Sequence, residues 1–270
     1  MSYLSFVWAY LLLLVLLAGG AGESRAAGTR EVPPPPAAPL LRDGDSRLKV
    51  LTHRILNTPR DAGLYLQRGR LYLERGEHAA ALADFDQALS LDPALDEAWF
   101  HRGLARGRAG RLDGAIADLT EYLRRRPDSS LAYTKRGVRY LWKGELDKAF
   151  ADYRQALKLD PKNAEAHDDI GVIYIEKGDA HKALVSFNRA LQLDPSYYKA
   201  YHNRATVYYL LDIYGQALAD ADKALALNPG NKETLTLKAV ILEAMGRDDE
   251  ARAVRLQAER ARPSNWSERY

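Results

Sequence analysis

Apolar residues recur along this chain with the three- or four-residue spacing of short amphipathic helices. In the segment 164–197, small or apolar residues recur every three or four positions, first over 170–175 and again over 183–191. This spacing places each set on one face of a helix. Gly178 separates the two sets and Pro195 follows the second; glycine suits a helix end and proline cannot continue a helix. The segment is therefore predicted to form a helical hairpin with one apolar side.

The same pattern recurs along most of the chain with a period of 34 residues. The six copies are 62–95, 96–129, 130–163, 164–197, 198–231 and 232–265. The prolines that mark the period are Pro59, Pro93, Pro127, Pro161, Pro195, Pro229 and Pro263. A small residue of the first helix recurs as Gly69, Gly103, Gly137, Gly171, Ala205 and Ala239, and the alanine that opens the second as Ala81, Ala115, Ala149, Ala183, Ala217 and Ala251. Each hairpin can bury its apolar side only against its neighbours, which predicts a stack of hairpins.

The period and the order aromatic, Gly, Tyr, Gly, Ala, aromatic, Ala, Pro resemble the tetratricopeptide repeat family over residues 62–265. The resemblance implies an all-α, right-handed superhelical solenoid of antiparallel helix pairs. It also implies that the first helices line a concave groove that binds a peptide or protein, without catalysis. Arg255 and Glu259 replace an aromatic residue and a leucine in the sixth copy, as suits a terminal repeat with a solvated face. A helix within 42–61 is expected to cap the other end.

Charged residues covary between the two helices of a hairpin. Four copies have an arginine before the small residue of the first helix and an aspartate sixteen positions later: Arg68 and Asp84, Arg102 and Asp118, Arg136 and Asp152, Arg204 and Asp220. The fourth copy has Ile170 and Ser186 instead. We predict ion pairs that fix the register of the helices. The second copy departs most from the pattern, at Arg106, Tyr122 and Arg125, and loosened or shifted packing is expected there.

The N-terminal residues 1–22 carry no charge and include the apolar run LLLLVLLA. Their length fits a cleaved signal peptide, which implies a periplasmic or secreted protein, although no lysine or arginine precedes the apolar core. An uncleaved membrane anchor is the alternative, and a misassigned start is a third possibility. Residues 23–41 form a proline-rich linker with an expected extended conformation. Residues 266–270 form a C-terminal tail.

The composition and motifs of the chain exclude several kinds of functional site. The chain has no cysteine, which excludes disulfides, thiolate metal sites and cysteine nucleophiles. Its net charge of +3 is too small to indicate a general polyanion binder. No Walker loop, H-E-x-x-H, nucleophile elbow or G-x-G-x-x-G motif is present, and no cofactor is predicted.

The resemblance implies which side chains face the groove. The predicted partner-binding residues are Phe100, His101, Arg108, Lys135, Trp142, Asp168, Asp169, Ile175, His202, Asn203 and Tyr209. Trp142 and Tyr209 are the expected anchors, since large aromatic side chains dominate binding energy when a partner buries them. The alternative is that both residues pack on a neighbouring first helix.

Two other functions remain open. Asp168, Asp169 and His202 are expected to be neighbours, and two carboxylates with an imidazole could bind a metal ion or move a proton. The second and third copies are rich in arginine and lysine, which would suit nucleic acid only if they formed a continuous basic face. The lysine and asparagine pattern of chaperone-tail binders is absent. The favoured prediction is a protein-interaction scaffold, exported or tethered to a membrane.

Overall fold

The computed structural model describes residues 46–261, and this part of the chain contains thirteen helices and no strand. The N-terminal helix is α2 (Ser46–Asn57). Six pairs follow: α3 (Ala62–Glu74) and α4 (His78–Leu91), α5 (Asp96–Arg108) and α6 (Leu112–Arg125), α7 (Ser130–Trp142) and α8 (Leu146–Leu159), α9 (Ala164–Glu176) and α10 (Ala180–Leu193), α11 (Tyr198–Leu210) and α12 (Tyr214–Leu227), α13 (Lys232–Ala244) and α14 (Asp248–Arg260). The predicted leader, linker and tail lie outside the described residues.

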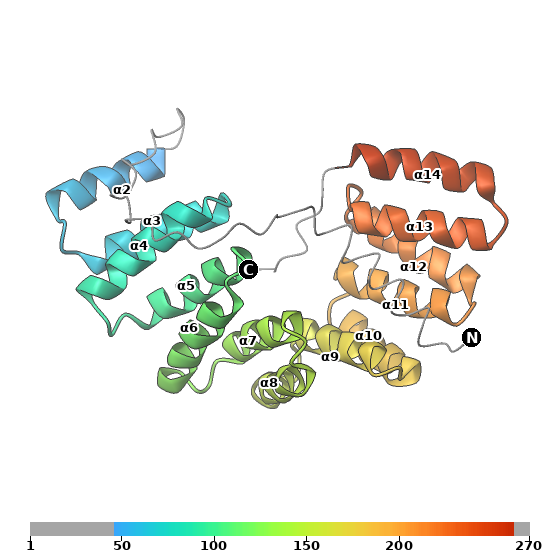
Figure 1. The fold of residues 1–270 in the computed structure, drawn as a ribbon, viewed down its shortest axis with the longest axis horizontal. Coiled ribbons are helices and arrows are strands. Elements are labelled where there is room, and N and C mark those ends of the chain that lie inside the picture. The colour runs from blue at the N-terminus through green and yellow to red at the C-terminus, as the bar shows by residue number, and fades with distance from the viewer. Residues whose placement is uncertain (1–45, 262–270) are drawn as a thin grey trace, which may run out of the picture. The chain divides into compact units, whose positions relative to one another are not determined.

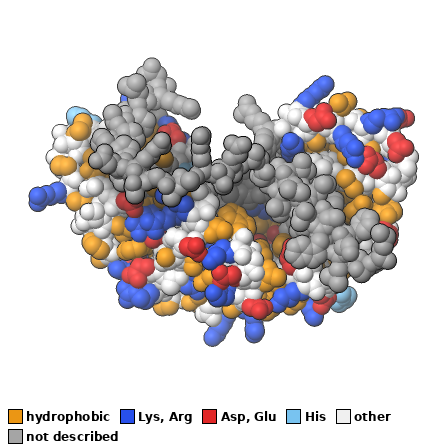
Figure 2. Space-filling model, in the orientation of Figure 1, with side chains coloured by type: hydrophobic (Ala, Val, Ile, Leu, Met, Phe, Trp, Pro, Cys, Tyr) orange, Lys and Arg blue, Asp and Glu red, His pale blue; other side chains and the backbone are white. Residues whose placement is uncertain are grey.

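The helices pack in chain order, as Figure 1 shows. Each second helix contacts its own first helix and the first helix of the next pair, which makes the fold an all-α helical repeat solenoid. First helices of successive pairs also contact one another, from α3 with α5 to α11 with α13, whereas no two second helices of the described chain do. The first helices therefore form the more closely spaced, inner layer of the stack. Figure 2 shows that charged and apolar side chains are interspersed on one face of the molecule.

Close packing within a hairpin depends on the glycine of the first helix. A Cβ atom on Gly171 would lie 2.5 Å from the ring of Phe187, and one on Gly137 would lie 2.7 Å from the ring of Tyr153. Both aromatic side chains are fully buried and also pack against the following pair. The absence of a side chain on the first helix thus makes room for the largest residue on the second.

The turns between paired helices use a left-handed residue. Gly178 has a φ of 75°, and glycines hold this position in four other pairs. The fifth pair has Asp212 there, with a φ of 58°, and its carboxylate accepts a hydrogen bond from the Tyr214 hydroxyl at 2.6 Å. Aspartate tolerates this conformation because its short side chain can bond locally.

The predicted ion pairs are present in all four copies. Each arginine donates through Nε and Nη2 to the two carboxylate oxygens of its aspartate, at 2.7–2.9 Å. In the fourth copy Ile170 is buried and the Ser186 hydroxyl bonds to the Lys182 carbonyl of its own helix at 2.9 Å. The arginines therefore have a structural role and are not available as ligand contacts.

The second pair is well packed, contrary to the expectation of loosened helices. Ala115 and Leu119 are fully buried between α5 and α6. Arg106 replaces the usual tyrosine without loss of packing because its Nη1 lies 2.8 Å from Asp118 Oδ2. This aspartate therefore pairs with two arginines, Arg102 and Arg106.

Among the described helices, none combines the length and the apolar character needed to cross a membrane.

Candidate functional site

A hollow of about 200 Å³ opens on the layer of first helices, where α7, α9 and α11 lie next to one another. We call it the central hollow. It is lined by Val138, Leu141, Trp142, Glu165, Asp168, Asp169, Val172, Tyr197, Lys199 and Asn203. The hollow thus gathers residues from three successive repeats.

One wall of the central hollow is acidic because α9 presents three carboxylates within a single turn. Glu165, Asp168 and Asp169 are three and four residues apart, which places them on the same helix face. Asn203 of α11 donates to both oxygens of Asp168 at 3.1 Å. Lys135 of α7 donates to both oxygens of Glu165 at 2.9 Å. These contacts hold the first helices of adjacent repeats together beneath the hollow.

Burial makes the two aspartates of the central hollow weak acids at neutral pH. The pKa of Asp168 is raised to about 7, chiefly because burial disfavours the charged form. The pKa of Asp169 is raised well above its usual value by burial and then by the negative charges of Glu165 and Asp168. Its Oδ2 is buried, and the Tyr153 hydroxyl is a hydrogen-bonding neighbour of this carboxyl group. Asp169 therefore places a largely buried carboxyl group in the lining of the hollow.

The central hollow also has apolar lining residues. Val138 and Leu141 come from α7, and Val172 comes from α9. Trp142 is 46 % exposed although it is a large aromatic residue. The guanidinium of Arg139 lies 5.0 Å from the centre of its ring, a cation–π distance. An apolar wall beside carboxylates suits a side chain with an apolar stem and a cationic end.

The predicted groove residues do not all face outward. Four of the eleven are buried: Phe100, Lys135, Asp168 and His202. The last three bond to the neighbouring first helix. Phe100 packs on Tyr122, with ring centres 5.1 Å apart. Ile175 is partly buried in the core around Phe187. These residues support the inner layer, because neighbouring first helices pack closely enough to cover positions that would face solvent on one helix.

Other predicted groove residues lie away from the central hollow. His101 stacks on Phe85 with ring centres 6.0 Å apart, and burial followed by the charge of Arg70 lowers its pKa to about 4. Arg108 Nη1 lies 3.4 Å from the Leu73 carbonyl of α3. The ring of Tyr209 lies 6.0 Å from that of Tyr214. Only Trp142, Asp168, Asp169 and Asn203 of the predicted set line the central hollow.

The histidine does not join the two aspartates. Nδ1 of His202 lies 3.0 Å from Thr234 Oγ1 of α13, and burial lowers its pKa to about 4. No group of three potential metal ligands in the described ranges is placed to hold an ion. The expected constellation of Asp168, Asp169 and His202 is therefore not formed.

Besides the aliphatic Val138, Leu141 and Val172, three residues of the central hollow lie outside the predicted set: Glu165, Tyr197 and Lys199. Helical spacing could have found two of them. Glu165 precedes Asp168 by three residues and Lys199 precedes Asn203 by four, so each shares a helix face with a predicted residue. Tyr197 lies just before α11 and is buried beside Leu191 and Ala200, which no helix-face pattern indicates.

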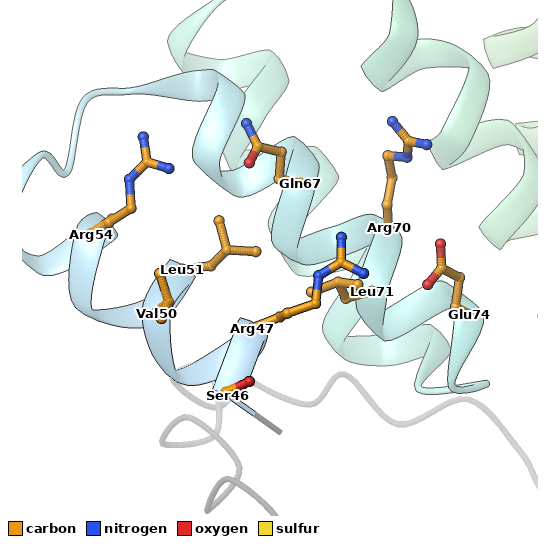
Figure 3. A pocket seen from close by; sticks show the side chains of 9 residues that line it. All are labelled: Ser46, Arg47, Val50, Leu51, Arg54, Gln67, Arg70, Leu71 and Glu74. Atoms are coloured by element: carbon orange, nitrogen blue, oxygen red, sulfur yellow. The ribbon is translucent and has the colours of Figure 1, made fainter. Parts of the chain in front are cut away.

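A second hollow, of about 390 Å³, lies between α2 and α3. We call it the N-terminal hollow. It is lined by Ser46, Arg47, Val50, Leu51, Arg54, Gln67, Arg70, Leu71 and Glu74. Figure 3 shows Arg54 and Arg70 on separate helices, with Leu51 extending into the space between them. Its titratable lining residues are mostly basic, whereas those of the central hollow are mostly acidic.

Several solved structures have folds similar to that of this chain. A tetratricopeptide repeat protein from Parabacteroides merdae matches with a TM-score of 0.69 and 19% identity over 81% of this chain and 86% of that one. PilW, described as a type IV pilus biogenesis factor, matches with a TM-score of 0.65 and 21% identity over 74% and 92%. A chain of the APC/C hetero-tetramer Cut9–Hcn1 matches with a TM-score of 0.72 and 20% identity over 80% of this chain, which spans only 44% of that chain's length.

No curated protein is detectably similar to this sequence. Family models give a clear assignment. Models described as TPR repeat match residues 137–178 and 171–212, and models described as tetratricopeptide repeat match 66–130 and 202–265. Together they cover most of the chain. The chain belongs to the tetratricopeptide repeat family.

Proposed function

We propose that this protein is a non-enzymatic scaffold that binds a partner protein along the layer of first helices, with the central hollow as the main contact. The exposed Trp142 is the observation that supports this most directly. A tryptophan left 46 % exposed beside a hollow is the kind of side chain that contributes most when a partner buries it. Repeat proteins of this family offer this layer for protein contacts, and the central hollow gives it a defined position.

The chemistry of the central hollow selects the partner. A lysine or arginine of an extended segment can lay its methylene groups on Val138 and Val172 and direct its charge to Asp169. The carboxyl group of Asp169 lines the hollow, and its neighbours Glu165 and Asp168 are acidic as well. An acidic segment offers no cation to the carboxyl groups on α9, and each of these groups that ionised would repel it. The proposed partner therefore presents a basic residue beside an apolar one.

The proposal includes export or membrane tethering through residues 1–22. Support comes from the sequence, whose apolar run followed by small residues is typical of a signal peptide. A factor of type IV pilus biogenesis has the same fold. Sequencing the N-terminus of the mature protein distinguishes the two forms, because a start near Glu23 indicates cleavage and a start at Met1 or Ser2 indicates a retained anchor.

Nucleic acid is the weaker alternative because the basic residues of the second and third repeats are largely neutralised. Arg125 and Arg126 lie within 4 Å of Asp96, and Lys143 lies 2.6 Å from Asp113. Ion pairs of this kind break up the continuous basic face that a polyanion requires. We therefore place the binding function in the central hollow.

A peptide-binding measurement tests the proposal. The probe is a short fluorescein-labelled peptide with a leucine–lysine pair in a glycine–serine background, and its matched control has glutamate in place of lysine. Fluorescence anisotropy with the full chain should show tighter binding of the lysine peptide. Trp142→Ala and Asp169→Asn should each weaken it by about tenfold or more.

The matched control variant is Val185→Ala, which removes a 56 % exposed side chain from α10 and leaves the first helices unchanged. It should bind the lysine peptide as the parent does. Equal affinity of the lysine and glutamate peptides, or unchanged affinity in Trp142→Ala, would show that the central hollow is not the binding site.

A further inference from the structure

The stack of helix pairs begins with half a repeat. In each complete pair the second helix packs on its own first helix and on the next one, so three helices touch mutually. The helix α2 contacts α3 as a second helix would, but no first helix precedes α2 among the described residues. The N-terminal hollow lies along both α2 and α3. It occupies the side of these helices where the first helix of a preceding pair would pack.

The sequence upstream of α2 is unsuited to supply that helix. A first helix in register with the repeat would fall at residues 28–40, which precede α3 by one period. This stretch reads GTREVPPPPAAPL and contains five prolines. Each proline lacks the N–H donor of a helical bond and costs about 3 kcal/mol in a helix interior. Residues 28–40 are therefore unsuited to form the missing first helix.

The wall of the N-terminal hollow indicates the chemistry of that helix. Val50, Leu51 and Leu71 provide an apolar strip, and Val50 remains 56 % exposed. Arg54 and Arg70 flank the strip from separate helices, as Figure 3 shows. Neither of these two guanidiniums has a carboxylate partner in the described part of the chain.

The positive charge of Arg70 acts on the neighbouring His101. After burial, it is the next cause of the lowered pKa of His101. Arg47 adds a third guanidinium to the lining, and Glu74 is the one carboxylate there. The wall is therefore net positive around an apolar centre.

We propose that the N-terminal hollow binds an acidic amphipathic helix of a separate protein, which completes the half repeat. The apolar stripe of the incoming helix packs on Val50, Leu51 and Leu71 in place of a first helix. Its aspartates and glutamates face Arg54 and Arg70. Helix-in-groove binding of this kind is governed by apolar anchors at helical spacing, with charges that fix orientation.

This site is independent of the central hollow. It involves α2 and α3, whereas the central hollow involves α7, α9 and α11. The two hollows also differ in the sign of their charge, so they would select different partners. The protein would then connect two partners through one rigid repeat array.

The test uses the full chain and two synthetic helical peptides. Both have leucines at i, i+3, i+4 and i+7; one has glutamate at the flanking positions and the other has lysine there. Fluorescence anisotropy at low salt should show that the glutamate peptide binds at least about tenfold more tightly. The preference should decrease as salt is added.

Charge reversal identifies the site. The double variant Arg54→Glu/Arg70→Glu should bind the glutamate peptide about tenfold or more weakly than the parent does. It should bind the lysine peptide more tightly. Both side chains are exposed, so the fold should persist, as circular dichroism would verify. Arg154→Glu places the same change at an exposed position on α8 and should leave both affinities unchanged.

Four outcomes would overturn the proposal. Equal binding of the two peptides would show that Arg54 and Arg70 do not favour an acidic helix. Unchanged affinities in the double variant would show the same. Tighter binding of the glutamate peptide after deletion of residues 28–40 would assign the hollow to the chain's own upstream segment. A concentration-dependent dimer that Arg54→Glu/Arg70→Glu abolishes would assign it to a second copy.

Discussion

Arg204 of α11 and Asp220 of α12 form a two-pronged ion pair, with Nε and Nη2 each 2.7 Å from a carboxylate oxygen. The guanidinium also lies between the rings of Tyr201 and Tyr208, at 5.6 and 5.9 Å from their centres. The same arrangement recurs around Arg136. The pair thus joins the two helices of a repeat, and rings on the first helix hold the arginine in place.

Removal of one member of this pair should destabilise the protein strongly. Asp220→Ala leaves the partly buried guanidinium of Arg204 without its carboxylate, and breaking a buried pair costs about 3–5 kcal/mol. Because Arg204 keeps some exposure, we expect a loss near the lower end of that range. Urea unfolding followed by circular dichroism measures it.

The fourth repeat provides the control for this prediction. The double variant Arg204→Ile/Asp220→Ser introduces the combination found at Ile170 and Ser186. Its loss should be smaller than that of Asp220→Ala, since no charge is left unpaired. A double variant that is less stable than Asp220→Ala would show that the pair contributes more than register.

The contact between Gly171 and Phe187 should show strong coupling. Alanine normally favours a helix over glycine by about 1 kcal/mol, but a Cβ on Gly171 would lie 2.5 Å from the ring. The overpacking should dominate and cost about 1–3 kcal/mol. Adding Phe187→Ala should remove the clash, since the fifth repeat has Ala205 with Ala221 at these positions.

A double-mutant cycle by urea unfolding measures this coupling. The cost of Gly171→Ala should vanish or reverse in the Phe187→Ala background. Gly215→Ala is the matched glycine control, because nothing lies within 4 Å of its added Cβ. Additive effects of Gly171→Ala and Phe187→Ala would contradict the close approach.

The fold and the ion pairs could be predicted from the sequence because both depend on a period that recurs in many copies. Register along a helix also indicated the face that carries Trp142 and Asp169. Register could not indicate how deeply each side chain is buried, because burial depends on the distance to the neighbouring first helix. His202 and Lys135 were therefore expected on the surface, whereas α13 and α9 cover them. Similarly, the helix before Pro59 was predicted to cap the stack, but its sequence gave no sign of an open side.

The raised pKa of Asp169 should make stability depend on pH. The folded state binds the proton of Asp169 more tightly than the unfolded state does. The protonated carboxyl group therefore contributes stability that is fully present below the unfolded pKa near 4 and is lost as pH rises through the folded pKa. Asp168, with a pKa of about 7, acts in the same direction. Asp169→Asn removes the contribution of Asp169, so the variant should lose less stability than the parent as pH rises from 5 to 8.

Unfolding midpoints at several pH values measure this difference. Asp147→Asn makes the same substitution at a side chain that is 94% exposed, and its pH profile should follow that of the parent. An Asp169→Asn profile parallel to that of the parent would show that the carboxyl group is ionised in the folded protein.

Binding of a basic peptide in the central hollow should release protons. The bound cation favours the ionised forms of Asp168 and Asp169, so each must lose a proton that it holds below its raised pKa. The other charged or titratable groups around them are Glu165, Lys135 and Lys199, with Tyr153 beneath. The affinity of the lysine peptide should therefore fall by up to about tenfold per pH unit per carboxyl group as pH decreases from 8 to 6.

Isothermal titration in two buffers of different ionisation enthalpy counts the protons released at a fixed pH. Asp169→Asn should release fewer protons and flatten the pH dependence, whereas Asp147→Asn should change neither. The lysine ammonium of the peptide stays charged throughout this range, since its pKa is about 10.4, so the effect can be assigned to the protein. Proton uptake instead of release, or affinity independent of pH, would mean that the peptide does not contact these carboxylates and that Trp142 alone determines where it binds.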